Sequence, residues 1–361
     1  MTTAALRNIH QAFGAHEVLS GLDLDIESGE YLVLLGPSGC GKTTILRLIA
    51  GLQTPDQGTV LLGGESVNET PPRSRDVSMV FQGDSLYPHL SVRQSVQLAL
   101  KGKHSAAEIA ERMKTAVELT KIGPVLDRMP DRLSGGERRR AAIAKAIAQS
   151  CSVRLLDEPM SALDVAVRQE LQDDILHWHA QNPGTSIHVT HDGNEAMRIA
   201  DRIAVLDKGK VAQLATPNEI YASPATISAA LSIGTPAMNM VSAQLIDGRV
   251  VSDSPNVTIN IQLPSHVSDR DLRLGVRAED LSTQAIEQAA IRFCTKASKC
   301  RRAGFEVRCD LEDQSIVTLG SKVDLGSQAE IMESGIILGA PESAVHCFDA
   351  DSGERIDKTM H

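Results

Sequence analysis

Hydrophobic and polar residues alternate along the first part of the chain, from Leu6 to Ile26, and Gly14 interrupts the alternation. A period of two places every second side chain on one face of a strand. Residues 6–26 are therefore predicted to form two or three antiparallel strands. Further along, short apolar runs bounded by turn residues predict additional strands. They are Tyr31–Leu35, Thr59–Leu62, Val77–Phe81, Val153–Leu156, Ser186–Thr190, Ile203–Leu206 and Val211–Leu214.

The pattern becomes helical between about 84 and 150. Ser91–Gln94 and Ser105–Glu108 have the sequence of capping boxes, which mark helix N-termini. Apolar residues then recur at helical spacing from Ile109 to Val117. We interpret this stretch as a helical insertion into an α/β sheet.

A second change in pattern follows Ala237, where short alternating segments are separated by Gly, Pro, Asp and Ser. This is typical of a small all-β domain. A length of 361 residues also favours two domains. We therefore predict an α/β domain at 1–235, with its helical part at about 84–150, and a C-terminal all-β domain at 236–361.

Composition narrows the possible partners. The net charge is −10 and aromatic residues make up 2% of the chain, which argues against nucleic acid as a partner. The six cysteines include no Cys-x-x-Cys pair, so we expect a reduced, cytosolic protein without a zinc site. The N-terminal sequence is not that of a signal peptide, and no apolar run approaches the ~20 residues that span a bilayer. A membrane role is expected only through a partner.

One segment, Gly36–Thr43, matches the phosphate-loop pattern G-x-x-x-x-G-K-[ST] at every fixed position. It lies between a predicted strand and a predicted helix, as that pattern requires. Glycines let backbone N–H groups approach a polyphosphate, and the helix N-terminus attracts the anion. Lys42 should contact the β- and γ-phosphates, and Thr43 should ligate Mg²⁺. The predicted phosphate-binding residues are Gly36, Pro37, Ser38, Gly39, Cys40, Gly41, Lys42, Thr43 and Thr44.

Polar residues follow several predicted strands. Asp157 and Glu158 end the strand at 153–156, where the first can hold the Mg²⁺ shell and the second can orient or deprotonate a water. Gln82 and His191 also follow strands, at the edge where ligands sit in open α/β sheets. A lone histidine there is more often structural. Phe13 is equally compatible with a core residue and with a ring stacked on a nucleobase.

With these motifs in this order, residues 1–235 resemble the ATP-binding subunits of ABC transporters. A GTPase or kinase would not carry the motif Ser134–Gly136 followed by Asp157 and Glu158. The segments that carry the resemblance are Gly36–Thr44 (Walker A), Gln82 (Q-loop), Leu133–Glu137 (LSGGQ-type motif), Leu155–Glu158 (Walker B), Ser161–Asp164 (D-loop) and His191 (switch histidine).

The resemblance implies a role for each residue. Phe13 would stack on adenine, and Thr43, Gln82 and Asp157 would hold Mg²⁺. Glu158 would be the general base, acting with Lys42, Gln82 and His191. Two subunits would form a head-to-tail homodimer with ATP between them. Further nucleotide contacts would come from Ser134, Gly135, Gly136, Glu137 and Asp164.

A narrower resemblance is to the ATPases of maltose and sn-glycerol-3-phosphate importers. It rests on Val80–Gln82, Leu86–Val92, Leu274–Asp280 and His346–Asp349. It implies import of a sugar, polyol or sn-glycerol 3-phosphate, two integral-membrane permease subunits and, indirectly, a solute-binding protein. The subunit would sit peripherally on the cytoplasmic face of the inner membrane, with residues just after Gln82 against the permease. The C-terminal domain would be oligonucleotide-binding-like and regulatory.

Other hypotheses remain open. The solute could be a polyamine, sulfate or iron, or the chain could be a soluble ABC ATPase without a permease. A nucleotide-binding but inactive subunit is suggested by departures from the family pattern: Glu137 replaces the usual Gln, and Arg154 stands in a central strand where an apolar residue is usual. A third departure is Gly193, which also replaces Gln. A buried Arg154 should have a partner or reach the strand end.

Overall fold

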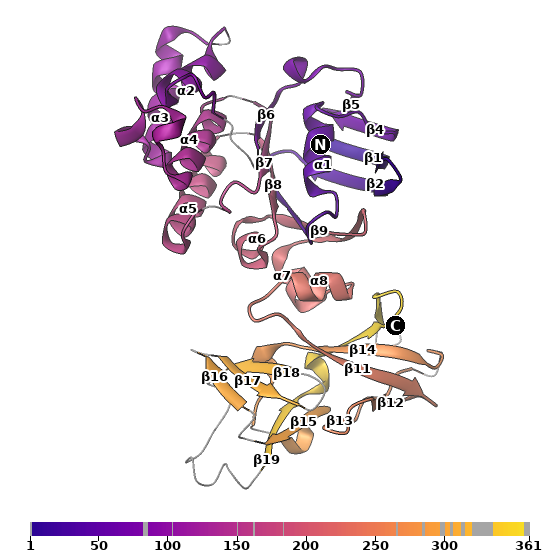
Figure 1. Cartoon of the computed structure of the whole chain (residues 1–361). Helices are drawn as coiled ribbons and strands as arrows, with labels where there is room; N and C mark the ends of the chain where they lie inside the picture. Colours follow the sequence, from indigo (N-terminus) through magenta and orange to yellow (C-terminus); the bar gives the residue numbers. More distant parts are fainter. Residues whose placement is uncertain are drawn as a thin grey trace. The chain divides into compact units, whose positions relative to one another are not determined.

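The computed structural model describes residues 2–81, 86–102, 104–149, 151–161, 163–182, 184–264, 266–283, 286–296, 300–303, 306–311, 315–319 and 335–356. The chain divides into two compact units, Met1–Pro217 and Asn218–His361 (Figure 1). The first combines sheets with helices, and the second is rich in strands. This confirms the predicted fold class.

The first unit is built on a six-stranded sheet in the order β10-β9-β3-β8-β7-β6. Strands β3, β7 and β8 are buried along their whole length, and they pair in parallel. Their carboxyl ends therefore meet at one edge of the sheet, which is where the predicted site residues follow them. The strands are β3 (Tyr31–Leu35), β6 (Val77–Val80), β7 (Val153–Asp157), β8 (Thr185–Thr190), β9 (Arg202–Asp207) and β10 (Lys210–Ala215).

A second, antiparallel sheet has the order β2-β1-β4-β5. Its β1–β2 pairing confirms the strands predicted at 6–26. Helix α1 (Lys42–Ala50) contributes Ile45, Leu46, Leu48 and Ile49 to a core that also contains residues of both sheets. The helix is thus fixed by apolar burial, which sets the position of its N-terminus. The strands are β1 (Thr2–Phe13), β2 (His16–Glu27), β4 (Gln57–Leu62) and β5 (Glu65–Ser66).

The helical pattern predicted at about 84–150 is found as a group of three helices beside the six-stranded sheet, α2, α3 and α4 (Figure 1). Both predicted capping boxes are present, at Ser91 with Gln94 and at Ser105 with Glu108. Two further helices precede β8 and β9. The bounds are α2 (Val92–Leu100), α3 (Ala106–Thr120), α4 (Gly135–Ala148), α5 (Val165–Gln181) and α6 (Gly193–Ile199).

The second unit contains a five-stranded sheet, β12-β11-β14-β20-β21, and two three-stranded sheets, β13-β15-β19 and β16-β17-β18. Apolar residues from all three sheets share one core. The elements are α7 (Pro217–Ala222), α8 (Ile227–Ser232), β11 (Asn239–Ile246), β12 (Arg249–Ser252), β13 (Val257–Ile259), β14 (Arg270–Val276), β15 (Ile291–Lys296), β16 (Cys300–Ala303), β17 (Glu306–Asp310), β18 (Ser315–Leu319), β19 (Gly335–Ala340), β20 (Val345–Asp349) and β21 (Arg355–Ile356).

The division at Pro217 falls before the boundary predicted at 235. The buried Arg277 explains the difference, because its guanidinium donates to the carbonyls of Tyr221 at 2.8 Å and Ile233 at 3.0 Å. Helices α7 and α8 therefore pack with the strand-rich unit. The helical pattern of this segment does not show which domain it contacts.

Cys309 in β17 is disulfide-bonded, and Cys300 is its register partner in β16. The expectation of reduced cysteines is therefore wrong at Cys309. Sequence spacing without the strand register could not reveal this.

Arg154 is buried in β7 and has partners, as expected from its position. Its guanidinium lies 4.4 Å from the centroid of the Trp178 ring and donates to the carbonyls of Asn182 at 3.3 Å and Gly184 at 3.4 Å. An aromatic face and backbone oxygens thus stabilise this charge inside the sheet.

Candidate functional site

The phosphate loop turns sharply between β3 and α1. Gly36 has a φ of 157°, and a Cβ atom there would lie 2.4 Å from the Leu206 carbonyl oxygen. Gly41 has a φ of 105° and is the N-cap of α1. Only glycine adopts these positions without strain or collision. The loop therefore closely surrounds the N-terminus of α1, where unpaired N–H groups and the helix dipole favour an anion.

Lys42 points into this loop and is buried. Its Nζ atom donates to the carbonyls of Gly36 and Pro37, both at 2.7 Å. It also lies 3.8 Å from the Cys40 Sγ atom. Burial raises the pKa of the Cys40 thiol, and the Lys42 charge opposes this rise. The loop therefore holds one cation among neutral groups, suited to a phosphate oxygen.

Thr43 and Asp157 bring two oxygen donors together. The Thr43 Oγ1 atom donates to Asp157 Oδ1 at 3.0 Å. Burial raises the pKa of Asp157, while the hydrogen bond from Thr43 lowers it. Hydroxyl and carboxylate oxygens are ligands that Mg²⁺ accepts together with substrate phosphates. In the part of the chain that the structure describes, no cluster of three or more His, Cys, Asp or Glu side chains could hold a metal by itself. The pair fits Mg²⁺ bound jointly with a nucleotide.

Glu158 directly follows β7 and has a φ of 44°. This left-handed conformation is rare for a residue with a side chain and costs on the order of 1 kcal/mol or more. Its N–H group donates to the Val189 carbonyl at 3.0 Å. Its Oε1 atom lies 3.1 Å from Nδ1 of His191, which follows β8 and is largely exposed. The carboxylate is thus turned toward the sheet edge and held by the imidazole.

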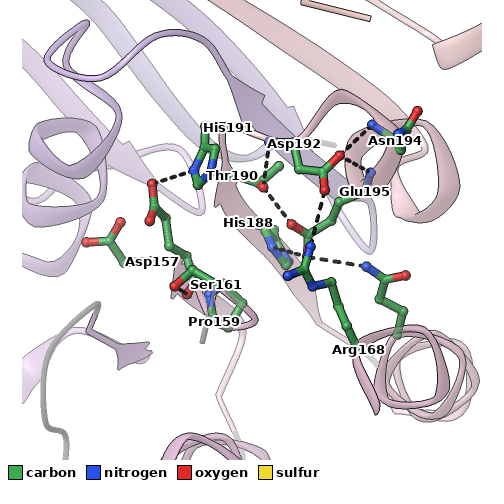
Figure 2. A network of polar contacts seen from close by, with 12 residues as sticks. Asp157, Pro159, Ser161, Arg168, His188, Thr190, His191, Asp192, Asn194 and Glu195 are labelled. Carbon is green, nitrogen blue, oxygen red and sulfur yellow. Dashed lines mark hydrogen bonds and ion pairs between the residues drawn. The ribbon is translucent and has the colours of Figure 1, made fainter. Parts of the chain in front are cut away.

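Behind His191 lies a buried polar network centred on Glu195 (Figure 2). Thr190 Oγ1 donates to Glu195 Oε2 at 2.6 Å, and Oε1 lies 3.4 Å from His188 Nε2. The other His188 nitrogen lies 3.0 Å from the Tyr31 hydroxyl. Burial tends to raise the Glu195 pKa, but the hydrogen bonds and charge of its partners outweigh it and lower the pKa to about 2. Glu195 is therefore an anion that anchors the start of α6.

Asp192 links this network to α5. Its Oδ1 atom caps α6 by accepting the N–H groups of Asn194 at 2.9 Å and Glu195 at 3.2 Å. Its Oδ2 atom accepts from Arg168 at 3.3 Å (Figure 2). Sequence reasoning missed Arg168, His188 and Glu195 as supports of His191. The Asp192 cap preceding a short helix was the one local signal present.

A cavity of about 370 Å³ joins the phosphate loop to Phe13. The Phe13 side chain is 51% exposed, which excludes the core interpretation for this ring. Glu158 lines the same cavity, so the predicted base-stacking ring, the phosphate loop and the predicted general base are brought together. The lining residues are Phe13, His16, Val18, Ser38, Gly39, Gly41, Lys42, Thr43, Thr44 and Glu158.

The motif Ser134–Glu137 does not line this cavity within the single chain. Ser134 caps α4, and Glu137 completes a capping box by accepting the Ser134 N–H at 2.8 Å. Hydrogen bonds from Ser134 lower the pKa of Glu137, and Arg128 lies 3.6 Å from it. Asp164 caps α5 through the Val167 N–H at 3.0 Å. Gln82 lies outside the described residues.

Comparisons with known proteins agree with this geometry. A family model described as ABC transporter matches residues 19–161. The chain is 38% identical to the sn-glycerol-3-phosphate import ATP-binding protein UgpC of Cereibacter sphaeroides over 99% of this chain and 100% of that protein. It is 41% identical to the alpha-glucoside transport ATP-binding protein AglK of Rhizobium meliloti over 78% of this chain and 80% of that protein.

Solved structures show the same relationship. A dimeric bacterial ABC transporter cassette is 28% identical, with a TM-score of 0.55, and the match covers 59% of this chain and 98% of that one. A dimeric post-hydrolysis state of an ATP-binding cassette, bound to ADP and phosphate, matches with a TM-score of 0.54. The near-complete alignment with import ATP-binding proteins, together with the phosphate-loop geometry, shows that this chain belongs to the ABC transporter family of ATP-binding proteins.

Proposed function

We propose that this protein is the ATP-hydrolysing subunit of an ABC importer for sn-glycerol 3-phosphate or a related sugar or polyol. One observation carries the hydrolytic role: the phosphate loop, Asp157 with Glu158, and His191 lie at the carboxyl ends of three adjacent parallel strands, β3, β7 and β8. The importer role is supported by relatives named as import ATP-binding proteins that match along nearly their whole length.

Binding follows from the loop and the cavity. The N–H groups at the start of α1 and the Lys42 ammonium would hold the β- and γ-phosphates, while Phe13 would stack on the base. Thr43 and Asp157 would hold Mg²⁺, which would neutralise charge on the phosphate oxygens. The Asp157 carboxylate and the Thr43 hydroxyl are already 3.0 Å apart, so little rearrangement is needed.

Hydrolysis requires a base beside the γ-phosphate. Glu158 would take a proton from a water molecule while the oxygen of that water forms a bond to the γ-phosphorus. The bond between the γ-phosphorus and the β–γ bridging oxygen would break at the same time, which releases ADP and phosphate. The hydrogen bond from His191 orients the Glu158 carboxylate. Gln82, for which the structure offers no test, stays a predicted Mg²⁺ and water ligand.

The assembly we propose is a head-to-tail homodimer on two permease subunits. Ser134 and the N-terminus of α4 lie outside the cavity of one chain, so a second copy could supply them to the first chain's nucleotide. Glu137 and Asp164 would accompany them. None of the helices among the described residues is long and apolar enough to cross a membrane. We propose that the permeases hold the subunit at the cytoplasmic face of the membrane, as its resemblance to importer ATPases implies.

The experiment compares the wild-type chain with Glu158→Gln. We expect Mg²⁺-dependent ATP hydrolysis by the wild type, and at least about a hundredfold loss in the variant. The variant should form an ATP-bound dimer on size-exclusion chromatography, whereas the wild type should return to monomer after hydrolysis. Hydrolysis unaffected by Glu158→Gln would overturn the assignment of the base.

The solute needs a separate measurement. Vesicles containing the complete transporter, with its permeases and binding protein, should accumulate radiolabelled sn-glycerol 3-phosphate or an α-glucoside in an ATP-dependent way. Stimulation of hydrolysis by a polyamine, sulfate or iron instead would favour the alternative importers. ATPase activity without any permease association would favour a soluble ABC ATPase.

A further inference from the structure

Arg139, in the second turn of α4, is buried, and its guanidinium donates to backbone carbonyls. It donates to the carbonyls of Pro159 at 2.7 Å, Asp157 at 2.8 Å and Phe81 at 2.6 Å. It also donates to the Glu158 carbonyl. Three consecutive residues of the turn that carries the catalytic acid therefore share one guanidinium.

This contact bears directly on the conformation of Glu158. A left-handed residue with a side chain persists only where its surroundings hold it. The Glu158 N–H group is held by the Val189 carbonyl, and the Glu158 carbonyl by Arg139 and by Ser161 Oγ at 3.1 Å. The peptide groups on both sides of the residue are thus fixed. The direction of the carboxylate depends on that backbone.

We infer that Arg139 is a positioning residue for ATP hydrolysis, which holds the left-handed turn that aims Glu158 at the attacking water. The inference rests on the proposed role of Glu158 as base. Arg139 also binds the carbonyl of Phe81, the residue before Gln82, and belongs to the helix that Ser134 caps. One guanidinium therefore ties the helix of the LSGGQ-type motif to the catalytic acid and to the end of β6. Lysine could not replace it, because a point charge lacks the planar set of donors.

Arg75 provides a matched control. It is 6% exposed, as is Arg139, and it also donates to backbone carbonyls. Its acceptors include Leu48 at 2.7 Å and Ile49 at 2.9 Å, at the C-terminal end of α1. Loss of either arginine leaves buried carbonyls without a donor, so both substitutions should lower the melting temperature. Of the two arginines, only Arg139 donates hydrogen bonds to the turn that carries Glu158.

The test measures ATP hydrolysis, nucleotide affinity and melting temperature for Arg139→Gln, Arg139→Lys and Arg75→Gln, in the transporter assembled with its permeases. We expect kcat to fall on the order of 10- to 100-fold in both Arg139 variants, with KM and the Kd for ATP within twofold of wild type, because a misaimed base impairs only the chemical step. Arg75→Gln should keep kcat within twofold. If Arg139→Gln does not fold, Arg139→Lys carries the comparison.

Two results would overturn the inference. One is a kcat within twofold of wild type for the Arg139 variants, measured below their melting temperatures. The other is an equal loss of kcat in Arg75→Gln, which would mean that activity follows stability alone. Either result, obtained with an active wild type and an inactive Glu158→Gln, leaves the proposed function intact. An inactive wild type in the assembled transporter would instead contradict the proposed function itself.

Discussion

The Nδ1 atom of His191 lies 3.1 Å from the Oε1 atom of Glu158, and the two residues follow neighbouring parallel strands, β8 and β7. The imidazole is largely exposed, whereas the carboxylate is mostly buried, and Glu158 lines the cavity at the phosphate loop. The contact brings two segments that are separate in sequence together at one edge of the sheet, where we propose that both act in hydrolysis.

We expect His191→Ala to lower kcat on the order of 10- to 100-fold, because the Glu158 carboxylate loses its orienting donor. Steady-state phosphate release measures the effect. His177→Ala is the control, since His177 lies on the exposed surface of α5 with Gln181 as a partner. Equal rates for the two variants would remove His191 from the mechanism.

The buried Glu195 should contribute to stability in a pH-dependent way. Its pKa is lowered from 4.5 to about 2, which corresponds to about 3 kcal/mol of stabilisation. A depressed folded-state pKa means that this stabilisation is complete above pH 4.5 and is lost as the pH falls toward 2. Urea unfolding of wild type and Glu195→Gln should therefore show a difference of a few kcal/mol at pH 7 that shrinks below pH 4.5. A difference that stays constant down to pH 3 would contradict the assigned pKa.

Phe13 should determine nucleotide affinity rather than rate. Stacking of a base on an aromatic ring is worth about 1–3 kcal/mol, so Phe13→Ala should raise KM for ATP by about 5- to 150-fold with kcat nearly unchanged. Phe13→Tyr keeps the ring and should behave as wild type. Fluorescent-nucleotide titration checks the same point without turnover. An alanine variant with unaltered KM would show that the base lies elsewhere.

The parts of the structure that were predictable from sequence depend on short-range chemistry. The strand–loop–helix around Lys42 needs only an apolar run, glycines and a helix, and these are adjacent in sequence. The capping boxes at Ser91 and Ser105 likewise need one turn of chain. Pairing of Asp157 with the phosphate loop was predictable because parallel strands place their carboxyl ends together.

The remaining features depend on contacts between distant segments. His188 alternates with apolar residues in β8, so nothing local distinguishes it from a core position, and only packing brings it to Glu195 and Tyr31. Arg139 stands in a run of three arginines, and nothing local distinguishes it from its neighbours as a buried donor. The contact of α7 with the segment that follows β14 likewise could not be read from local pattern, because it is made through Arg277.

Arg154 provides a test of the inactive-subunit hypothesis. Its guanidinium contacts Trp178 and the carbonyls of Asn182 and Gly184, the last of which lies just before β8. It therefore sits toward the amino end of the sheet, opposite the edge that carries Glu158. We expect Arg154→Met to keep kcat within twofold and to change the free energy of unfolding by no more than about 1 kcal/mol, because an apolar side chain of similar length replaces a buried cation.

Arg154→Ala is the matched comparison, since it removes the same charge and also the side-chain volume beside Trp178. It should lower the free energy of unfolding by about 2–4 kcal/mol through the cavity it leaves, again without altering kcat below the melting temperature. Urea unfolding and ATP hydrolysis on the same samples separate the two effects. If the wild type is inactive and Arg154→Met hydrolyses ATP, the arginine at position 154 is the cause of the lost ATPase activity. If both are active, the buried arginine is a tolerated structural substitution.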